Sequence, residues 1–172
     1  MKKKDKTNVM RLLDQAGVTY TSHFCEGAEG LSGDEIAKVM GEDPNQTFKT
    51  LVTVCAKTKE HFVFVVPVNK ELNLKKAANS VGAKSIEMIK AKELLPLTGY
   101  VHGGCSPIGM KKQFKTVIHK TAADFDTIFF SGGKIGYQVE LSLSELSKVL
   151  KYELKDIIEC KEEVTEPWKI YG

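Results

Sequence analysis

The stretch TFKTLVTVCAKTKEHFVFVVP, residues 47–67, decides the fold class. Its two arms, residues 47–56 and 61–67, are rich in Val, Phe and Thr, which are residues enriched in β-strands. The polar segment KTKE joins the arms, and two such runs with a short polar connection predict an antiparallel hairpin.

Lys49 stands inside the first arm among apolar neighbours. Side chains alternate between the two faces of a strand, so Lys49 shares a face with Leu51, and Thr50 lies on the other face. Such a lysine is either solvated on a polar face or placed at the rim of a partly enclosed surface. At a rim, its compact charge would suit a phosphate, a carboxylate or a developing oxyanion.

The rest of the chain mixes short helix and strand signals. Capping residues and glycine stops predict helices over residues 5–16, 32–40, 73–81, 90–97 (interrupted by Pro96), 142–150 and 155–159. Further strands are expected over residues 18–24, 114–120, 126–131 and 136–142. This order lacks regular βαβ alternation, so we expect an α/β (α+β type) single domain. Helices would pack on a curled, mixed or mostly antiparallel sheet.

Length and composition bound the class of protein. The chain has 172 residues with 42% hydrophobic and 27% charged residues, as in a single globular domain. We assign residues 1–159 to that domain and residues 160–172 to a C-terminal tail that Trp168 anchors. The longest apolar run is too short to span a bilayer, and no signal-peptide segment follows the basic N-terminus. A cytoplasmic protein is therefore expected, without membrane partners.

Charge and ligand spacing restrict the possible partners. Lys and Arg total 25 against 22 Asp and Glu, and Arg11 is the single arginine. A reader of duplex bases is expected to be richer in arginine, so weak or partner-assisted nucleic-acid binding fits better. The four cysteines and four histidines lack paired spacing, which argues against a zinc site and for reduced thiols. No metal or other cofactor is expected.

The segment HGGCSPIGMKK, residues 102–112, has the composition of a shaped loop. It fails the G-x-S-x-G pattern of a nucleophile elbow because Gly109 comes one residue late. It fails the P-loop pattern because Met110 stands where the lysine is required. A loop with free backbone N–H groups can still approach a carbonyl or phosphate oxygen closely. With SGGKIG, residues 131–136, it either frames one pocket or forms an ordinary turn.

Other candidates depend on geometry that the sequence does not show. Cys105 would act as a nucleophile only with an oriented base such as His102. Lys111 and Lys112, with Lys115 and Lys120, form either a patch for a nucleic-acid backbone or a solvated face.

Three motifs in fixed order nevertheless resemble one family. They are FKTL (residues 48–51), GGCSPIG (103–109) followed by two lysines, and SGGKIGYQVEL (131–141). Together they resemble the YbaK/EbsC-type aminoacyl-tRNA deacylases, which include the editing domains associated with prolyl-tRNA synthetase. The resemblance extends from the first helix to about Asp156 and is greatest to the free-standing branch that removes cysteine from cysteinyl-tRNA(Pro).

The resemblance implies roles for particular residues of this chain. Lys49 corresponds to the key lysine of the family, and Lys111 and Lys112 are assigned to the tRNA backbone. The implied substrate-binding residues are Thr50, Gly103, Gly104, Ser106, Pro107, Gly109, Ser131, Gly132 and Gly133. Cys25 stands where relatives have tyrosine, and Gln138 stands where some relatives have aspartate. Both are expected to line the amino-acid pocket. The amino acid removed is therefore cysteine, alanine or another small residue.

The resemblance also implies a mechanism. The substrate is the 3′ aminoacyl end of a mischarged tRNA, with prolyl-tRNA synthetase as the expected partner. In this branch the thiol of the substrate cysteine is thought to attack its own carbonyl and release a thiolactone, so no protein nucleophile is required. Two alternatives remain at the level of the sequence. One is a non-catalytic tRNA- or synthetase-binding module, and the other is a phosphate-binding protein.

Overall fold

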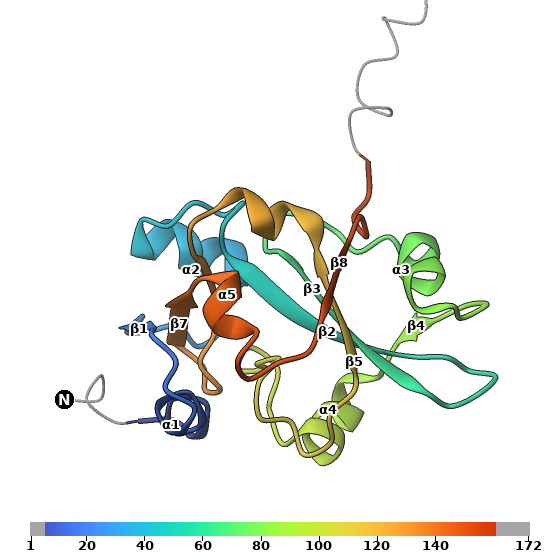
Figure 1. Cartoon of the computed structure of the whole chain (residues 1–172), viewed down its shortest axis with the longest axis horizontal. Coiled ribbons are helices and arrows are strands. Elements are labelled where there is room, and N and C mark those ends of the chain that lie inside the picture. The colour runs from blue at the N-terminus through green and yellow to red at the C-terminus, as the bar shows by residue number, and fades with distance from the viewer. Residues whose placement is uncertain (1–5, 161–172) are drawn as a thin grey trace, which may run out of the picture.

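The computed structural model describes residues 6–160, whose strands form two β-sheets (Figure 1). The strands are β1 (Thr21–Phe24), β2 (Phe48–Val54), β3 (His61–Pro67), β4 (Glu87–Met88), β5 (Lys115–His119), β6 (Ile128–Ser131), β7 (Tyr137–Leu141) and β8 (Glu153–Lys155). The helices are α1 (Asn8–Gln15), α2 (Gly33–Met40), α3 (Leu74–Val81), α4 (Ala91–Thr98), α5 (Leu143–Leu146) and the 3-10 helix η2 (Lys120–Asp124). Trp168 and the predicted tail after Cys160 lie outside the described residues.

The five-stranded sheet has the order β4-β2-β3-β5-β8 and is mixed. Its β2–β3 hairpin confirms the expected pairing, and Lys49 lies opposite Val66. β5 pairs in parallel with both β3 and β8. The three-stranded sheet, β1-β7-β6, is antiparallel. The expected mixed, largely antiparallel arrangement is therefore confirmed, divided into two sheets that an isolated bridge between Thr47 and Phe129 connects.

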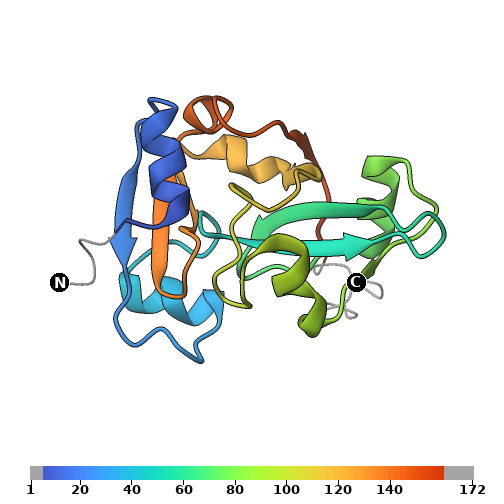
Figure 2. The same ribbon diagram turned by 90° about the horizontal axis from the view of Figure 1, so that it is seen from below.

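The hydrophobic core lies on both faces of the hairpin. Phe48 and Val52 pack into the cluster that α1 and the three-stranded sheet also enter. Leu51 faces the opposite way, towards Phe64 and α3. In Figure 2 the three-stranded sheet, α1 and α2 gather beside one end of the hairpin, and its other end extends away from them. The two faces of β2 that alternation predicted thus pack into two different apolar clusters.

Local signals explain where the helices begin and end. Ser32 and Glu35 form the predicted capping box of α2, and Asn73 caps α3. Gly41 and Gly82 end these two helices with φ of 72° and 73°, a conformation that glycine adopts without steric cost.

Three sequence expectations are corrected. α4 continues through Pro96 to Thr98, because one missing N–H in the last turn does not break the helix, and Gly99 N still donates to Leu95 O at 2.8 Å. α5 ends at Leu146, well before the predicted residue 150. The short helix expected over 155–159 was wrong, since this region holds the end of β8 and a bridge at Ile158. None of the helices within residues 6–160 has the length and apolar character that crossing a bilayer requires.

Candidate functional site

A cavity of about 500 Å³ lies between the two sheets. Most of its lining comes from four segments: residues 28–36 around the start of α2, residues 47–51 at the start of β2, the loop at 102–105, and residues 130–138 from β6 to β7. Val68 and Leu94 complete it. This volume is in the range of small-molecule sites. Both glycine-containing loops border this one cavity, which is one of the two alternatives that the sequence left open.

The cavity brings together five of the predicted site residues. These are Lys49, Thr50, Gly103, Ser131 and Gln138. The remaining predicted residues do not line it: Gly104, Ser106, Pro107, Gly109, Gly132, Gly133, Cys25, Lys111 and Lys112.

Lys49 provides the positive charge of the cavity wall. Its side chain is partly exposed, and within residues 6–160 it enters no ion pair. The neighbouring Thr50 Oγ1 is buried and has no hydrogen-bond partner among the described residues. A buried hydroxyl without a partner is costly, so a ligand group that reached this hydroxyl would be favoured.

The two glycine loops meet backbone to backbone beside the cavity. A Cβ on Gly104 would lie 3.1 Å from Ile135 N and 3.2 Å from Lys134 Cα. Gly103 has φ of 89°, which disfavours a residue with a side chain. Glycine therefore permits the close approach of the loops, and Gly103 brings bare backbone to the cavity.

The rest of the predicted substrate loop is directed into the protein core. Ser106 is fully buried, and its Oγ accepts a hydrogen bond from Ile108 N at 3.3 Å. A Cβ on Gly109 would lie 2.9 Å from Leu12 Cδ1, and one on Gly133 would lie 2.9 Å from Val9 Cγ2. These residues hold the loops against α1, so their direct contribution is to the shape of the loops.

Cys105 lines the cavity, and His102 lies nearby in the same loop. Burial raises the pKa of the Cys105 thiol to about 12. A cysteine needs to be a thiolate to attack an ester, so this environment opposes the nucleophilic role considered for Cys105.

Cys25 lies behind the cavity wall, 2% exposed. Its backbone N donates to Gly136 O at 2.8 Å, and Gly136 lines the cavity. The pKa of the Cys25 thiol is raised by burial and by the nearby Glu42 carboxylate.

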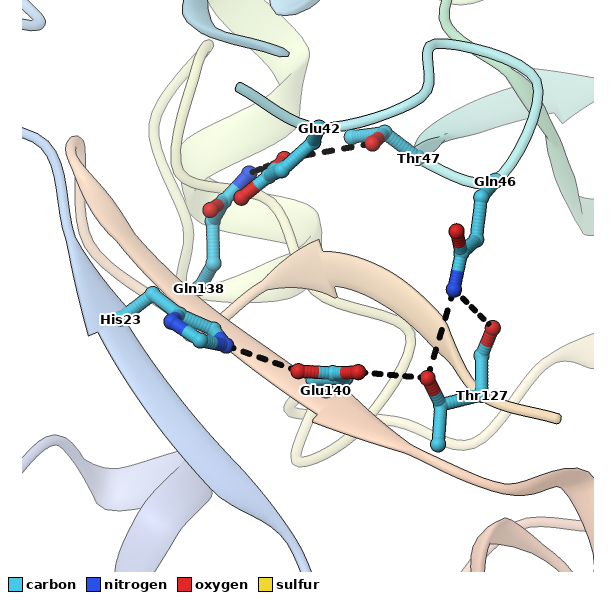
Figure 3. A network of polar contacts seen from close by, with 7 residues as sticks. All are labelled: His23, Glu42, Gln46, Thr47, Thr127, Gln138 and Glu140. Carbon is cyan, nitrogen blue, oxygen red and sulfur yellow. Dashed lines mark hydrogen bonds and ion pairs between the residues drawn. The ribbon is translucent and has the colours of Figure 1, made fainter. Parts of the chain in front are cut away.

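A carboxylate behind the cavity was missed by the sequence reasoning. Gln138 Nε2 donates to Glu42 Oε1 at 3.0 Å, and Thr47 Oγ1 lies 3.2 Å from the same oxygen. Figure 3 shows Glu42 between these two side chains, Gln138 from β7 and Thr47 from the residue just before β2. Burial raises the pKa of Glu42, and the hydrogen bonds from Gln138 and Thr47 oppose that shift.

A second set of polar contacts lies on the same face of the three-stranded sheet (Figure 3). Glu140 contacts His23 Nε2 at 2.9 Å and accepts from Thr127 Oγ1 at 2.6 Å. The hydrogen bond from Thr127 and the contact with His23 lower the pKa of Glu140. Gln46 Nε2 extends the chain by donating to Thr127 O at 2.8 Å.

The start of α2 was also missed as part of the site. Ser32, Gly33 and Glu35 line the cavity, and a Cβ on Gly33 would lie 2.7 Å from Val68 Cγ1. The capping box predicted a helix start, but its position depends on this tertiary contact.

Lys111 and Lys112 are exposed residues outside the cavity. Lys111 N donates to Thr98 O at 3.0 Å, at the end of α4, and its Nζ lies 3.5 Å from Pro96 O. Among residues 6–160, no three His, Cys, Asp or Glu side chains are grouped to hold a metal ion.

Comparison with known proteins places this geometry in context. Residues 29–149 match the family model of the aminoacyl-tRNA editing domain. A protein of Enterococcus faecalis, provisionally named Cys-tRNA(Pro)/Cys-tRNA(Cys) deacylase EbsC, is 45% identical over 142 residues, which cover 82% of this chain and 86% of that protein. Proline–tRNA ligase of Shouchella clausii is 34% identical over 83 residues, which cover 48% of this chain and 14% of the ligase.

Solved structures share the fold. The crystal structure of a hypothetical protein superposes with a TM-score of 0.80 at 22% identity, covering 89% of this chain and all of that one (100%). A crystal structure provisionally described as a trans-editing enzyme for prolyl-tRNA synthetase gives a TM-score of 0.76 at 21% identity, covering 91% of this chain and 100% of that one.

Proposed function

This chain belongs to the aminoacyl-tRNA editing domain family, and from that premise we propose that it is a trans-editing deacylase that cleaves cysteinyl-tRNA(Pro). The name of the Enterococcus faecalis relative, 45% identical, supports cysteine as the amino acid removed. The observation that carries the proposal is the cavity itself, which Lys49, Thr50 and Gly103 all line.

The chemistry needs orientation more than a protein nucleophile. An ester is already activated, so fixing its geometry and stabilising its oxyanion can supply most of the acceleration. In the proposed step the cysteine thiol of the substrate attacks its own ester carbonyl. The new C–S bond forms, the C–O bond to the terminal ribose breaks, and the thiol proton ends on the ribose oxygen. The products are a cyclic thiolactone and free tRNA.

Lys49, the backbone near Gly103 and Cys105 each have a place in the proposed mechanism. Lys49 lines the cavity, and its ammonium group is proposed to position the 3′ end and to stabilise the negative charge that develops on the carbonyl oxygen. Backbone N–H groups near Gly103 can donate to the same oxygen. The raised pKa of Cys105 fits a mechanism that leaves this thiol protonated.

We propose that selection of the tRNA depends on a partner. A net charge of +3 with one arginine offers little of the electrostatic attraction that phosphate backbones provide to autonomous binders. The match to part of a proline–tRNA ligase supports prolyl-tRNA synthetase as that partner, in the cytoplasm where translation takes place. Lys111 and Lys112 are exposed and are proposed contacts for the tRNA backbone.

The test is deacylation of three substrates: cysteinyl-tRNA(Pro), alanyl-tRNA(Pro) and prolyl-tRNA(Pro), each with and without prolyl-tRNA synthetase. We expect rapid loss of the cysteinyl ester, slower loss of the alanyl ester and an intact prolyl ester. Loss of no ester under any condition would contradict the proposed function and favour a binding module.

A further inference from the structure

The side-chain amide of Gln138 is held in one orientation. Gln138 lies on β7, lines the cavity and is 7% exposed. Its Nε2 donates to Glu42 Oε1 at 3.0 Å, whereas its Oε1 is buried without a hydrogen-bond partner among residues 6–160. A buried amide oxygen without a partner is unfavourable, so a hydrogen-bond donor that reached this atom from the adjoining cavity would be favoured.

Glu42 determines that orientation. An ionised carboxylate accepts hydrogen bonds and donates none, so the NH₂ end of Gln138 faces Glu42 and the carbonyl oxygen faces away. The Thr47 hydroxyl, 3.2 Å from the same carboxylate oxygen, helps to hold Glu42 in place. Glu42 does not itself line the cavity, so it acts through Gln138.

We propose that Glu42 is a positioning residue and that Gln138 Oε1, oriented by it, accepts a hydrogen bond from the α-ammonium group of the aminoacyl ester. This inference rests on the proposed function and assigns a binding partner to one end of the substrate.

The charges of the site favour the ammonium as the donor. Lys49 is the lysine of the cavity lining, and Glu35 is a lining carboxylate that accepts a hydrogen bond from Ser32 N. Glu42 adds an anion behind the lining, hydrogen-bonded to Gln138. An aminoacyl ester is complementary to this arrangement, since its α-amino end is cationic and its carbonyl oxygen becomes negative during cleavage. A hydrogen bond to a charged group is stronger than one to a neutral thiol.

The orientation depends on the ionisation of Glu42. Burial raises the pKa of this carboxyl group. The ionisable groups that act on it are His23 of β1, which favours the anion, and Glu140 of β7, which disfavours it, while the Cys25 thiol lies within reach of its charge. Once protonated, Glu42 can donate as well as accept, and it no longer enforces one orientation of Gln138. Activity should therefore fall on the acid side, at a pH above the usual range of a glutamate.

The test compares cysteinyl-tRNA(Pro) with N-acetylcysteinyl-tRNA(Pro), which keeps the thiol and the ester but lacks the ammonium. We expect wild type to prefer the free amine, and the ratio of the two kcat/KM values to fall about tenfold or more in Gln138→Met, as loss of a charge-assisted hydrogen bond predicts. Glu42→Gln should lower the same ratio and remove the acid limb of the pH profile. Gln46→Met is the matched control, because its amide donates to Thr127 outside the cavity, and it should keep the wild-type ratio.

The double variant Glu42→Gln/Gln138→Glu exchanges the two groups and distinguishes positioning from simple packing. An amide at position 42 can donate to a carboxylate at 138, whose other oxygen then faces the cavity, so the preference for the free amine should return. The inference would be overturned if Gln138→Met lowered kcat/KM equally for both substrates, or if Glu42→Gln kept the wild-type ratio of the two values. Either result would leave the assignment as a deacylase intact. If wild type cleaves neither substrate, the proposed function itself has failed, and this inference fails with it.

Discussion

Cys105 and Lys49 line the same cavity, but their surroundings favour different roles. Cys105 is 8% exposed, and burial raises its pKa to about 12. At neutral pH its thiolate is then less than roughly one part in 10,000. Lys49 remains partly exposed, as a charge that meets a ligand must.

Cys105→Ala should therefore retain catalysis. We expect kcat/KM for cysteinyl-tRNA(Pro) within about threefold of wild type, because no step needs this thiol. The smaller side chain should cost about 1 kcal/mol of stability through a small cavity. Deacylation assays and urea denaturation measure the two effects. A loss of activity greater than about 100-fold in a variant that is still folded would show that Cys105 is a nucleophile.

At the scale of elements, the glycine loops are held by their contacts with α1. Gly133 has φ of 102°, and a Cβ there would lie 2.9 Å from Val9 Cγ2. The neighbouring Gly132 offers a matched comparison, because its Cβ would make contacts no closer than 3.4 Å.

Gly133→Ala should lower the free energy of unfolding by about 1–3 kcal/mol, from backbone strain and overpacking. Gly132→Ala should cost less than about 1 kcal/mol. Chemical denaturation of both variants beside wild type measures the difference. Equal costs would mean that the strained conformation and the contact with Val9 do not limit stability.

Local chemistry explains which elements the sequence predicted. The hairpin and the ends of α2 and α3 follow from alternation, capping side chains and glycine stops, which act within a few residues. β8 was not predicted, because its strand character comes from parallel pairing with β5, more than 30 residues earlier in the chain.

In the site, too, residues marked by local sequence were predicted and those that depend on long-range contacts were not. Local pattern marked Lys49 and the two glycine loops as candidates, and the family resemblance assigned them to the site. Glu42 was missed because its contact with Gln138 joins residues 96 positions apart, which alternation and spacing do not show.

At the scale of the whole molecule, His119 connects the end of the described chain to the core. Its Nδ1 accepts a hydrogen bond from Ile157 N at 3.3 Å, and Ile157 is fully buried. Burial lowers the pKa of His119; Asp156 opposes this shift, and Lys120 and Lys76 add to it.

The stability of the protein should therefore depend on His119 in mildly acidic solution. The pKa of His119 in the folded protein lies below its unfolded value of about 6.5. Between these two pKa values the unfolded state binds more protons than the folded state. The stabilisation is therefore complete above about pH 6.5 and declines as the pH falls from about 6.5 towards the folded pKa. Urea denaturation from pH 5 to pH 7.5 should show this slope in wild type and a smaller one in His119→Asn. Identical slopes in the two proteins would contradict the lowered pKa.

The most direct measurement of the central claim is the single-turnover rate of cysteinyl-tRNA(Pro) cleavage by wild type and Lys49→Ala, with Lys57→Ala at the exposed hairpin turn as control. We predict that Lys49→Ala slows cleavage about 100-fold or more, the order expected when one stabilising group for an oxyanion is removed. Its melting temperature should remain close to that of wild type, and Lys57→Ala should cleave normally. Undiminished cleavage by a folded Lys49→Ala would contradict the assignment of this cavity as the deacylation site.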